Sequence, residues 1–520
     1  MKCERWLFVL ALALGAMLRL PQLGLRPMHT DEAVHAVKFG TLLETGTYRY
    51  DRNEYHGPTL NYLTLLPAWC TSETSIVQVT ETTLRIVPAL FGFGMVLLIL
   101  PLRDIGARPL AIGALLTACS PAMVFYSRYY IQETLLVFFA LGLIGAGYRF
   151  LQGGGIFWSL MAGMFAGLMF ATKETWLISC GAMSAALVAV LFLSRHRKGC
   201  GFATYVRGIG LAFLSGAVVS VLFYSSFFTH WQGVQDSLLS YQTYVLRAGE
   251  DTRHGHPWYY FLEMLMFRQG DHGPLWSEAA IVLFGALGIA GSFSGRKTEV
   301  GGGKDLKLFL GVYACLMLFI LSAIPYKTPW LVLGALQPLI LMAGYGVSLF
   351  LGSLHGGARI AGIVVALLLV SHLVWQAYQA NFVFYDDPVN PYAYSQPTND
   401  VKLIATALDD LLRHSPEEPA IQVVAPGDDY WPLPWYLRGI ARVGWWNHLG
   451  KDFVATPVIL ATPDVQQSLL WKLYEVPPPG QRPLYVPLFD RPMYLRPGKE
   501  IRGYVRLDLK EEATRSALDD

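Results

Sequence analysis

The stretch Pro27-Met28-His29-Thr30-Asp31-Glu32-Ala33-Val34-His35 comes directly after the first apolar segment of the chain. It places two adjacent carboxylates, Asp31 and Glu32, at the point where that segment would leave a membrane. Most of the remaining sequence is apolar, so charged groups clustered at this point need an explanation. We therefore take Asp31 as the candidate catalytic carboxylate and ask whether the rest of the chain fits this interpretation.

The composition is that of a polytopic membrane protein. Of the 520 residues, 53% are hydrophobic and 15% are charged, whereas soluble domains average about 25% charged residues. The formal net charge is +2 and neither a basic tail nor an arginine-rich run occurs. Nothing in the sequence therefore indicates a nucleic-acid partner.

The six cysteines are dispersed and form no C-x-x-C pair, which indicates neither a disulfide framework nor a zinc site. At the N-terminus, Lys2 and Arg5 precede an apolar run at 6–18, as in a signal peptide. No A-x-A-like cleavage site follows this run and further apolar segments do, which favours a retained first transmembrane helix.

A transmembrane helix needs about 20 mostly apolar residues. This criterion predicts about eleven transmembrane helices within a domain that covers residues 1–376. They lie at 6–24, 86–102, 109–126, 134–151, 156–172, 176–193, 205–224, 275–294, 306–325, 329–351 and 358–376.

Positive charge predicts the orientation of these helices, because Lys and Arg concentrate in cytoplasmic loops. With the N-terminus in the cytoplasm, the inner loops hold most of the loop cations, and the short outer loops hold one each. The chain is then a multi-pass protein of the cell membrane whose C-terminal part lies outside the cytoplasm. The short outer loops carry Arg128, Lys173 and Lys327.

Two predicted outer loops are long, at 25–85 and 225–274. The first contains an amphipathic helix over 31–46, with Gly46 as its C-cap, and a second apolar segment at 58–67. The second loop is rich in aromatic residues, which concentrate at the headgroup level of membranes. It is therefore expected to lie on the bilayer surface.

After the last apolar segment the composition changes. Residues 377–400 are rich in Asp, Pro, Asn and Tyr, as in a linker, and 401–520 read as a soluble extracytoplasmic α/β domain, because strand and helix patterns alternate there. The expected helices are 401–413, 434–437 and 464–474, and the expected strands are 420–425, 443–446 and 458–461.

The Asp31-Glu32 pair has two interpretations. Acids are favoured at a helix start by the helix dipole, and Thr30 or Asp31 is a suitable N-cap, so the pair could be an ordinary solvated helix terminus. Alternatively, a partly desolvated carboxylate at the end of a hydrophobic bundle can act as a base. The cations on the same side of the membrane favour the second interpretation.

The cations Arg128, Lys173 and Lys327 each interrupt a short outer loop between two apolar segments. Cations that converge at one end of a bundle can hold a phosphate. The alternative is that Lys and Arg merely extend to the interface, but three such loops on one side favour a phosphate site. Glu133 and Glu174 are candidate partners of Arg128 and Lys173, in a supporting role.

Histidines offer only weak candidates for metal ligands. His29 and His35 flank Glu32, and His254 and His256 form a second group, but the spacing is loose and no second ligand pair is defined. Hydrogen-bonded or surface histidines explain these positions better. We expect no defined metal site, although a divalent metal requirement stays open.

Several outer-loop motifs resemble those of the GT-C glycosyltransferases, in particular the protein O-mannosyltransferases, the aminoarabinose transferases of lipid A and the Agl23-type subgroup. The resemblance covers about residues 1–376 and rests on an ordered set of motifs. They are Thr30-Asp31-Glu32-Ala33, Leu43-Glu-Thr-Gly46, Tyr55-His-Gly-Pro58-Thr-Leu60-Asn-Tyr62, Ser127-Arg128 with Glu133, Phe170-Ala-Thr-Lys173-Glu174, and Lys327-Thr-Pro329-Trp330 with Gln337-Pro338.

The resemblance implies a sugar donor carried on a polyprenyl phosphate, with Asp31 as the catalytic carboxylate and Glu32 orienting or tuning the site. It implies that Arg128, Lys173 and Lys327 bind the donor phosphate and that the sugar is transferred with inversion. His56-Gly57-Pro58 departs from the family's Lys-Pro-Pro, so His56 becomes a candidate substitute for that lysine.

The predicted function is thus transfer of a sugar to a protein, lipid or glycan acceptor on the extracytoplasmic face. A translocase of lipid-linked saccharides, or a protein associated with one, is the alternative. A translocation path would place polar residues deep within the apolar segments, and few occur there. This favours chemistry at one surface.

Overall fold

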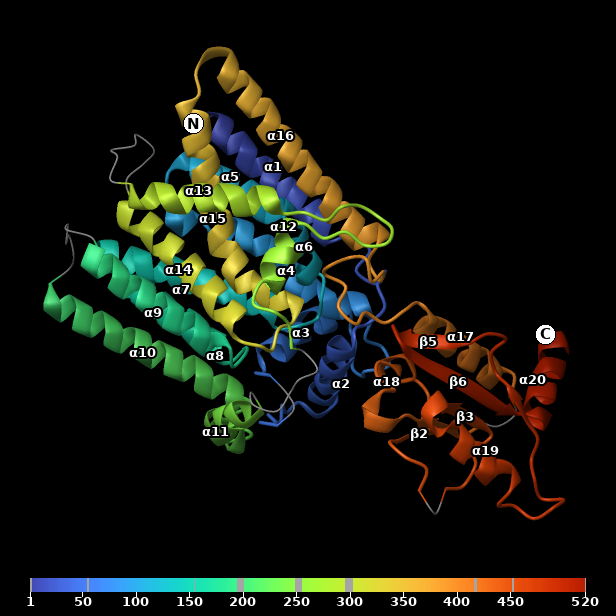
Figure 1. Cartoon of the computed structure of the whole chain (residues 1–520). Coiled ribbons are helices and arrows are strands. Elements are labelled where there is room, and N and C mark those ends of the chain that lie inside the picture. Colours follow the sequence, from blue (N-terminus) through green and yellow to red (C-terminus); the bar gives the residue numbers. More distant parts are fainter. Residues whose placement is uncertain are drawn as a thin grey trace.

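A computed structural model describes residues 2–53, 56–153, 155–193, 201–247, 255–294, 303–415, 419–450 and 453–519. A bundle of long helices forms most of the molecule, and an α/β domain from the last part of the chain lies against one end of it (Figure 1). Helix α2 (Thr30–Thr45), which carries Asp31, lies between the bundle and the α/β domain.

Each of the eleven segments predicted to span the membrane is helical. Seven of the described helices, counting short continuations such as η1 and η2, are long and apolar enough to cross a membrane, and an eighth is possible if α5 and α6 form one bent span. The helices are α1 (Lys2–Arg19), α4 (Glu81–Leu98) with η1 (Leu100–Ile105), α5 (Ala107–Cys119), α6 (Pro121–Ser127), α7 (Glu133–Gly153), α8 (Ile156–Phe170), α9 (Trp176–Leu193), α10 (Phe202–Tyr224), α13 (Ala279–Phe293), α14 (Lys304–Ala323), η2 (Pro329–Val332) leading into α15 (Leu333–Ser353), and α16 (Gly356–Tyr378).

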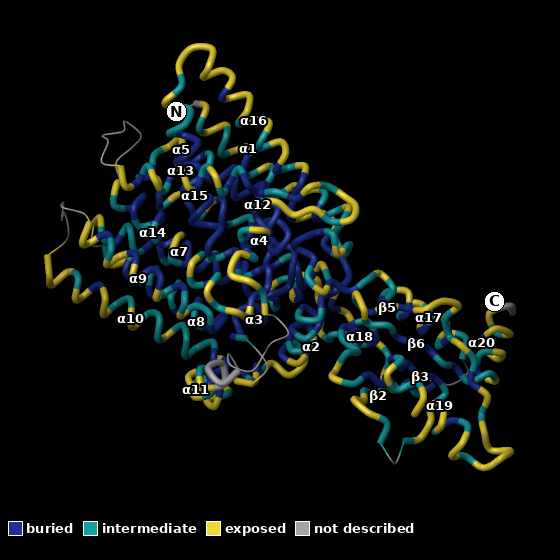
Figure 2. The backbone as a smooth tube through the Cα atoms, viewed as in Figure 1, coloured by how far each residue is buried: buried dark blue, intermediate teal, exposed yellow. Residues whose placement is uncertain are grey.

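By length and composition, seven or eight of the described helices can cross a membrane, which is fewer than the predicted number of about eleven. Helices α8 and α13 are apolar but short, and α1 carries charged residues at both of its ends. The break between α5 and α6 bends the chain by 56° at Ser120, whose side chain caps α6. Helix α15 is the most deeply buried of the spans and forms the centre of the bundle, as the dark core in Figure 2 shows.

Four further helices cover the end of the bundle next to the α/β domain or pack into its rim. They are α2, α3 (Thr59–Cys70), α11 (Gln232–Arg247) and α12 (Tyr260–Met266). The amphipathic helix expected at 31–46 is confirmed as α2, and Gly46 ends it in the left-handed conformation, with φ of 71°. A glycine adopts that conformation without steric cost, which explains its place as the cap.

The α/β domain is built on one mixed sheet. Strands β1 (Ile421–Val424), β2 (Val443–Trp446) and β3 (Val458–Ala461) pair in parallel, in the order β2-β1-β3. These three strands confirm the expected ones. The sheet continues through β6 (Lys499–Arg506), which pairs antiparallel with β3, β4 (Tyr485–Pro487) and β5 (Met493–Arg496).

Helices cover this sheet. They are α17 (Asp400–Arg413), α18 (Leu433–Tyr436), α19 (Gln466–Tyr474) and α20 (Leu507–Asp519), and the first three match expected helices. The sequence did not predict β6, because charged residues alternate along it with Ile501, Gly503 and Val505. Only that second set faces the core, so the strand lacks a continuous apolar run.

The segment 377–400, which has the composition of a linker, is packed against the bundle. Helix α16 continues through a π-helical turn at Gln379–Val383, and Asn390, Tyr392 and Gln396 beyond it are buried. Their polar atoms find partners in the bundle: the Tyr392 hydroxyl donates to Glu278 over 2.8 Å, and the Gln396 amide donates to the Pro27 carbonyl over 2.9 Å. This segment therefore reaches the stretch that carries Asp31.

Candidate functional site

The start of α2 is fixed by His29, which is its N-cap. Nδ1 of His29 accepts a hydrogen bond from the Asp31 backbone N–H over 3.1 Å, and the His29 N–H donates to the Glu32 carboxylate over 2.9 Å. Because Nδ1 accepts, Nε2 carries the proton and donates to the Tyr394 carbonyl at 3.1 Å. Burial lowers the pKa of His29, which keeps the ring neutral. Both ring nitrogens are thus occupied, and the ring acts as a cap.

Glu32 is enclosed completely and paired with Arg85 of α4. Two Arg85 nitrogens each reach one Glu32 oxygen over 2.7 Å, and the Tyr130 backbone N–H adds a third donor over 2.7 Å. Burial alone would raise the pKa of Glu32, but the charge and hydrogen bonds of Arg85 lower it to about 2. Arg85 also donates to the carbonyls of Leu23, Arg26 and Pro27. The pair therefore fastens α2 to the segment before it.

Asp31 has a different environment. Its side chain is 46% exposed, and among the described residues only the neutral His29 ring comes within ion-pair distance of it, with Nδ1 4.0 Å away. None of the described residues donates a hydrogen bond to this carboxylate. Of the two acids, Asp31 alone is accessible and free to accept a proton from a bound molecule.

Lys173 and Glu174 lie at the same end of the bundle, and both are paired. Lys173 forms an ion pair with Glu133 at the start of α7. Glu174 accepts from His56 Nδ1 over 2.8 Å and from the Tyr50 hydroxyl over 3.0 Å. The structure thus joins Glu133 to Lys173 and His56 to Glu174, whereas the sequence suggested Glu133 with Arg128 and Glu174 with Lys173.

The loop that carries His56 is joined to the loop that carries Lys173. The Gly57 N–H donates to the Thr172 carbonyl over 3.1 Å and the Thr59 N–H to the Ala171 carbonyl over 3.2 Å. A side chain at Gly57 would bring its Cβ within 2.2 Å of the Ala171 oxygen, so only glycine fits this contact. The two loops therefore hold His56 and Lys173 in a fixed relation.

Arg128 and Lys327 are placed differently from Lys173. Arg128 is buried, and its guanidinium donates to the carbonyl of Arg19, the last residue of α1, over 2.9 Å and to the Pro21 carbonyl just beyond it over 2.7 Å. It thus caps the C-terminus of α1. Lys327 Nζ donates to the His256 carbonyl over 3.1 Å and to Ile324. Its loop reaches α2 through Trp330, whose ring packs edge-on against His29 with centroids 5.6 Å apart.

Neutral polar side chains lie beside Asp31. His35 follows Asp31 by one helical turn and approaches the Gln132 amide nitrogen at 3.4 Å and the His56 ring at 5.9 Å between centroids. Burial, helped by the charge of the neighbouring His56, lowers the pKa of His35 to about 3. His35 is therefore uncharged at neutral pH.

An apolar groove runs between α7, α9, α14 and α15. Glu133, Thr175 and Trp330 line its outer part, and Ile144 and Leu310 lie farther in. Glu133 and Ile144 are about 16 Å apart along α7, given the rise of 1.5 Å per residue. One end of the groove thus lies beside Lys173, the ion-pair partner of Glu133, and beside Trp330, whose ring packs against His29.

The weak metal candidates find no common site in the structure. Among the described residues, no group of three His, Cys, Asp or Glu side chains is placed to hold a metal ion. His256 stacks on Tyr260 with ring centroids 4.3 Å apart. His254 lies outside the described residues.

Sequence reasoning missed Arg85, Asn61 and Gln132. Arg85 lies one residue before a segment predicted to span the membrane, and an arginine there needs a buried acidic partner. That requirement was the available signal for its pairing with Glu32. Asn61 and Gln132 gave no signal, because single amides in apolar loops are common.

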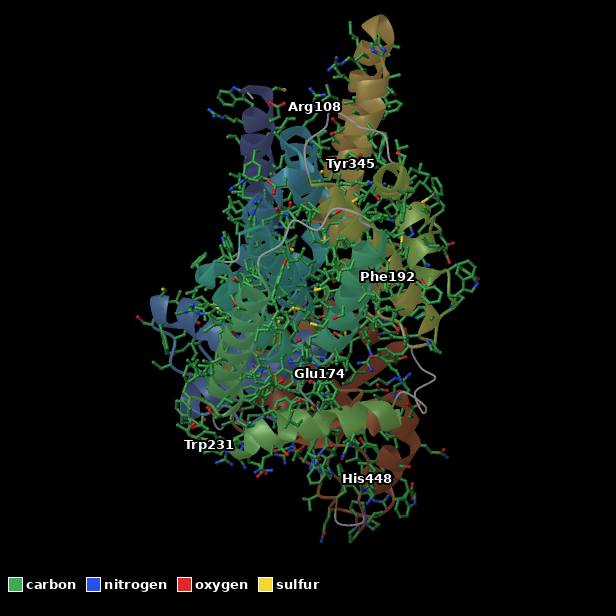
Figure 3. All side chains as sticks on the ribbon, turned by 90° about the vertical axis from the view of Figure 1, so that its left-hand side faces the viewer. Arg108, Glu174, Phe192, Trp231, Tyr345 and His448 are labelled. Atoms are coloured by element: carbon green, nitrogen blue, oxygen red, sulfur yellow. The ribbon has the colours of Figure 1, made fainter. Side chains whose placement is uncertain are left out.

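The labelled residues of Figure 3 show the two ends of the bundle. Glu174 lies at the end next to Trp231 and to His448 of the α/β domain, and Arg108 lies at the opposite end. We call the first the outer end, after the predicted topology. Asp31, His56 and Lys173 all lie there through the contacts described above.

Comparison with solved structures identifies the fold. ArnT from Cupriavidus metallidurans bound to undecaprenyl phosphate superimposes with a TM-score of 0.60 at 14% identity, over 95% of this chain and 97% of that chain. Its apo state gives 0.61 at 15% identity, over 97% and 98%. Archaeal oligosaccharyltransferase AglB from Archaeoglobus fulgidus, in complex with an inhibitory peptide and a dolichol-phosphate, gives 0.55 at 12% identity, over 89% and 69%.

The chain therefore shares the fold of ArnT and AglB. No protein-family model matches the sequence, and no curated protein matches it either. The likeness thus extends over nearly the whole length of ArnT, including the α/β domain, at an identity that conserves architecture and little else.

Proposed function

We propose that this protein is a glycosyltransferase that moves a sugar from a polyprenyl-phosphate carrier to an acceptor hydroxyl at the outer end of the bundle. The observation that carries the proposal is Asp31, an accessible carboxylate without a charged partner among the described residues, near the mouth of an apolar groove. The structural neighbours were solved with undecaprenyl phosphate and with a dolichol-phosphate, which are lipid carriers of this kind.

Asp31 acts as the general base. Its carboxylate takes the proton of the acceptor hydroxyl while the hydroxyl oxygen bonds to the anomeric carbon of the sugar. The bond between that carbon and the phosphate oxygen breaks, and the polyprenyl phosphate leaves with the bonding electrons. A single displacement of this kind inverts the anomeric centre.

The leaving phosphate needs positive charge near the groove mouth. Lys173 supplies it, because its partner Glu133 lines the groove and its loop is fixed against the His56 loop. Lys327 and His56 are second contributors in this proposal, Lys327 through the loop that packs on His29 and His56 through its place beside Glu174. Arg128 and Glu32 are assigned to structure, since their polar atoms are committed to other groups.

The groove favours transfer over translocation. Apart from Glu133 at its mouth, its lining residues carry no charge. This lining matches the apolar character of a polyprenyl chain and offers no polar path for a headgroup through the bilayer. The resemblance of the outer-loop motifs to the Agl23-type subgroup stays a prediction within the same proposal.

A transfer assay tests the proposal. Purified protein is given polyprenyl-phosphate-linked sugars and candidate protein, lipid and glycan acceptors, and Asp31→Asn is compared with wild type. We expect Asp31→Asn to lower transfer by about 10²- to 10⁴-fold, the range typical of a general base. Asp271→Asn, an exposed acid in the loop between α12 and α13, is the matched control and should leave transfer unchanged.

Normal transfer by Asp31→Asn would overturn the catalytic assignment. The rival activity has its own readout, because movement of a fluorescent lipid-linked saccharide across vesicles measures translocation directly. Translocation without transfer by any donor and acceptor would replace the proposed function with the alternative.

A further inference from the structure

Two buried amides near Asp31 have polar atoms without a partner. Asn61 of α3 is fully buried, and neither Nδ2 nor Oδ1 has a hydrogen-bond partner among the described residues. Gln132, 1% exposed, likewise has an unpartnered Oε1. An unsatisfied buried polar atom costs roughly 1–3 kcal/mol of stability, so such atoms need a reason.

The two amides belong to one region of the molecule. Gln132 Nε2 lies 3.4 Å from Nδ1 of His35, the residue one turn after Asp31. Asn61 precedes Thr64 by one turn of α3, and the Thr64 hydroxyl lies 3.0 Å from the hydroxyl of Tyr130, two residues before Gln132. Both amides therefore adjoin the segment 130–132, next to the helix face that carries Asp31.

The chemistry of these side chains is that of sugar recognition. An amide offers both a donor and an acceptor, as a sugar hydroxyl does, and the neutral His35 ring adds one more of either kind. None of the three side chains brings a charge, in contrast to the neighbouring Lys173. A site of this type suits uncharged hydroxyl groups and offers nothing specific to an additional carboxylate or amine.

We propose that Asn61, Gln132 and His35 form the subsite that holds the sugar ring of the donor and selects an uncharged hexose or pentose. This rests on the proposed function and adds to it the class of sugar and the residues that choose it. In this arrangement the carrier chain occupies the groove, the phosphate faces Lys173, and the sugar hydroxyls satisfy the amide atoms that lack partners within the protein.

The test compares two ligands that differ only in the sugar. Affinities are measured in detergent for undecaprenyl phosphate alone and for the same carrier bearing mannose, glucose, galactose or arabinose. Asn61→Leu and Gln132→Met replace each amide by an apolar side chain of similar shape. We expect both to weaken binding of the preferred sugar-bearing carrier by about 3- to 30-fold, the value of one or two hydrogen bonds, and to leave binding of the bare carrier unchanged.

The thermal stability of the unliganded protein is the second readout. Replacing the two unpartnered polar atoms of Asn61 by apolar ones should keep or raise the melting temperature, whereas an amide with a structural role would lower it. Gln132→Met also removes the contact of Nε2 with His35, so this readout applies to Asn61→Leu. Asn381→Leu is the matched control. Asn381 is also buried and has an unpartnered oxygen, but its nitrogen donates to the Ala377 carbonyl over 2.8 Å within α16. This control should lower the melting temperature without changing the preference for the sugar-bearing carrier.

Three outcomes would overturn the subsite. They are equal losses for both ligands, no loss for either ligand, and a lower melting temperature for Asn61→Leu with an unchanged sugar preference. Failure of the proposed function looks different, because wild type itself would then bind no sugar-bearing carrier better than the bare one. In that case the proposed subsite is overturned together with the proposed function, and the wild-type measurement alone shows it.

Discussion

The Glu32 carboxylate accepts four hydrogen bonds, from Arg85, His29 and Tyr130, and has no exposed surface. The Asp31 carboxylate, one residue earlier, is 46% exposed and receives no hydrogen bond from any described residue. Successive residues on a helix point about 100° apart. One turn of α2 therefore carries both a saturated acid and an accessible one.

The two carboxylates therefore have different roles, Glu32 in the stability of the fold and Asp31 in the proposed chemistry. A carboxylate that is paired and saturated holds the local structure together and has no capacity left to accept a proton. A carboxylate that is exposed and without such partners adds little to stability and can react. The Glu32–Arg85 pair makes the Asp31 position possible, because it fixes the start of α2 on which Asp31 stands.

The largest expected effect comes from exchanging the two acids for their amides. Glu32→Gln leaves the Arg85 charge buried and unpaired, and we expect it to lower the free energy of unfolding by about 3–5 kcal/mol. Asp31→Asn should change it by less than about 0.5 kcal/mol. Chemical unfolding in mixed micelles measures both. Glu32→Leu combined with Arg85→Met removes both charges and should recover much of the lost free energy of unfolding. Equal losses of that free energy in Glu32→Gln and Asp31→Asn would contradict the comparison.

The second prediction uses pH. The folded-state pKa of Glu32 is lowered from 4.5 to about 2, because Arg85 outweighs the effect of burial. Its stabilisation is therefore complete above pH 4.5 and lost as the pH falls through about 2. The gap in unfolding free energy between wild type and Glu32→Gln should shrink by roughly 3 kcal/mol over that window. A gap that stays constant from pH 7 to pH 2 would show that Glu32 is not ionised in the folded protein.

A variant of Lys173 tests the phosphate site that is proposed near Asp31. Lys173→Met alone leaves Glu133 buried without its partner, so the matched variant is Lys173→Met with Glu133→Leu. We expect the double variant to fold and to bind undecaprenyl phosphate about 10- to 100-fold more weakly, the value of a charge-assisted hydrogen bond. Unchanged affinity in a folded double variant would remove Lys173 from the phosphate site.

The smallest expected effect concerns the α/β domain. The Tyr436 hydroxyl accepts a hydrogen bond from the Met28 N–H over 2.8 Å, one residue before the cap of α2. Tyr436→Phe should lower the free energy of unfolding by about 1 kcal/mol. Tyr494→Phe, which alters an exposed ring, serves as the control and should have no effect. Equal stability of both variants would mean that the domain does not help to hold this stretch.

Much of the fold could be predicted from the sequence, because helices that cross a membrane need long apolar runs and α2 has a clear period and cap. The strand β6 could not be predicted, since half of its residues are charged. The segment 377–400 has the composition of a linker, yet the structure packs it against the bundle. Its buried Tyr392 and Gln396 side chains donate to Glu278 and to the Pro27 carbonyl, which lie more than a hundred positions away in the sequence.

The candidate site was predictable in its residue types and less so in its pairings. Topology alone brought Asp31, His56 and Lys173 to one end of the bundle. It could not show that Arg128 caps α1 or that Glu32 pairs with Arg85, because both depend on side-chain directions in the folded chain. The role proposed for the amides of Asn61 and Gln132 could not be predicted for the same reason, because it rests on the hydrogen-bond partners that they lack in the folded chain.

The hydrogen bond between Met28 and Tyr436 can form only after Tyr436 has been synthesised. The two residues are 408 positions apart, and synthesis at 5–20 residues per second separates them by roughly 20–80 s. Gln396 and Lys402, which donate to the carbonyls of Pro27 and of Gly24 and Leu25, arrive nearly as late. The stretch that carries Asp31 is thus synthesised well before the residues that complete its hydrogen bonds.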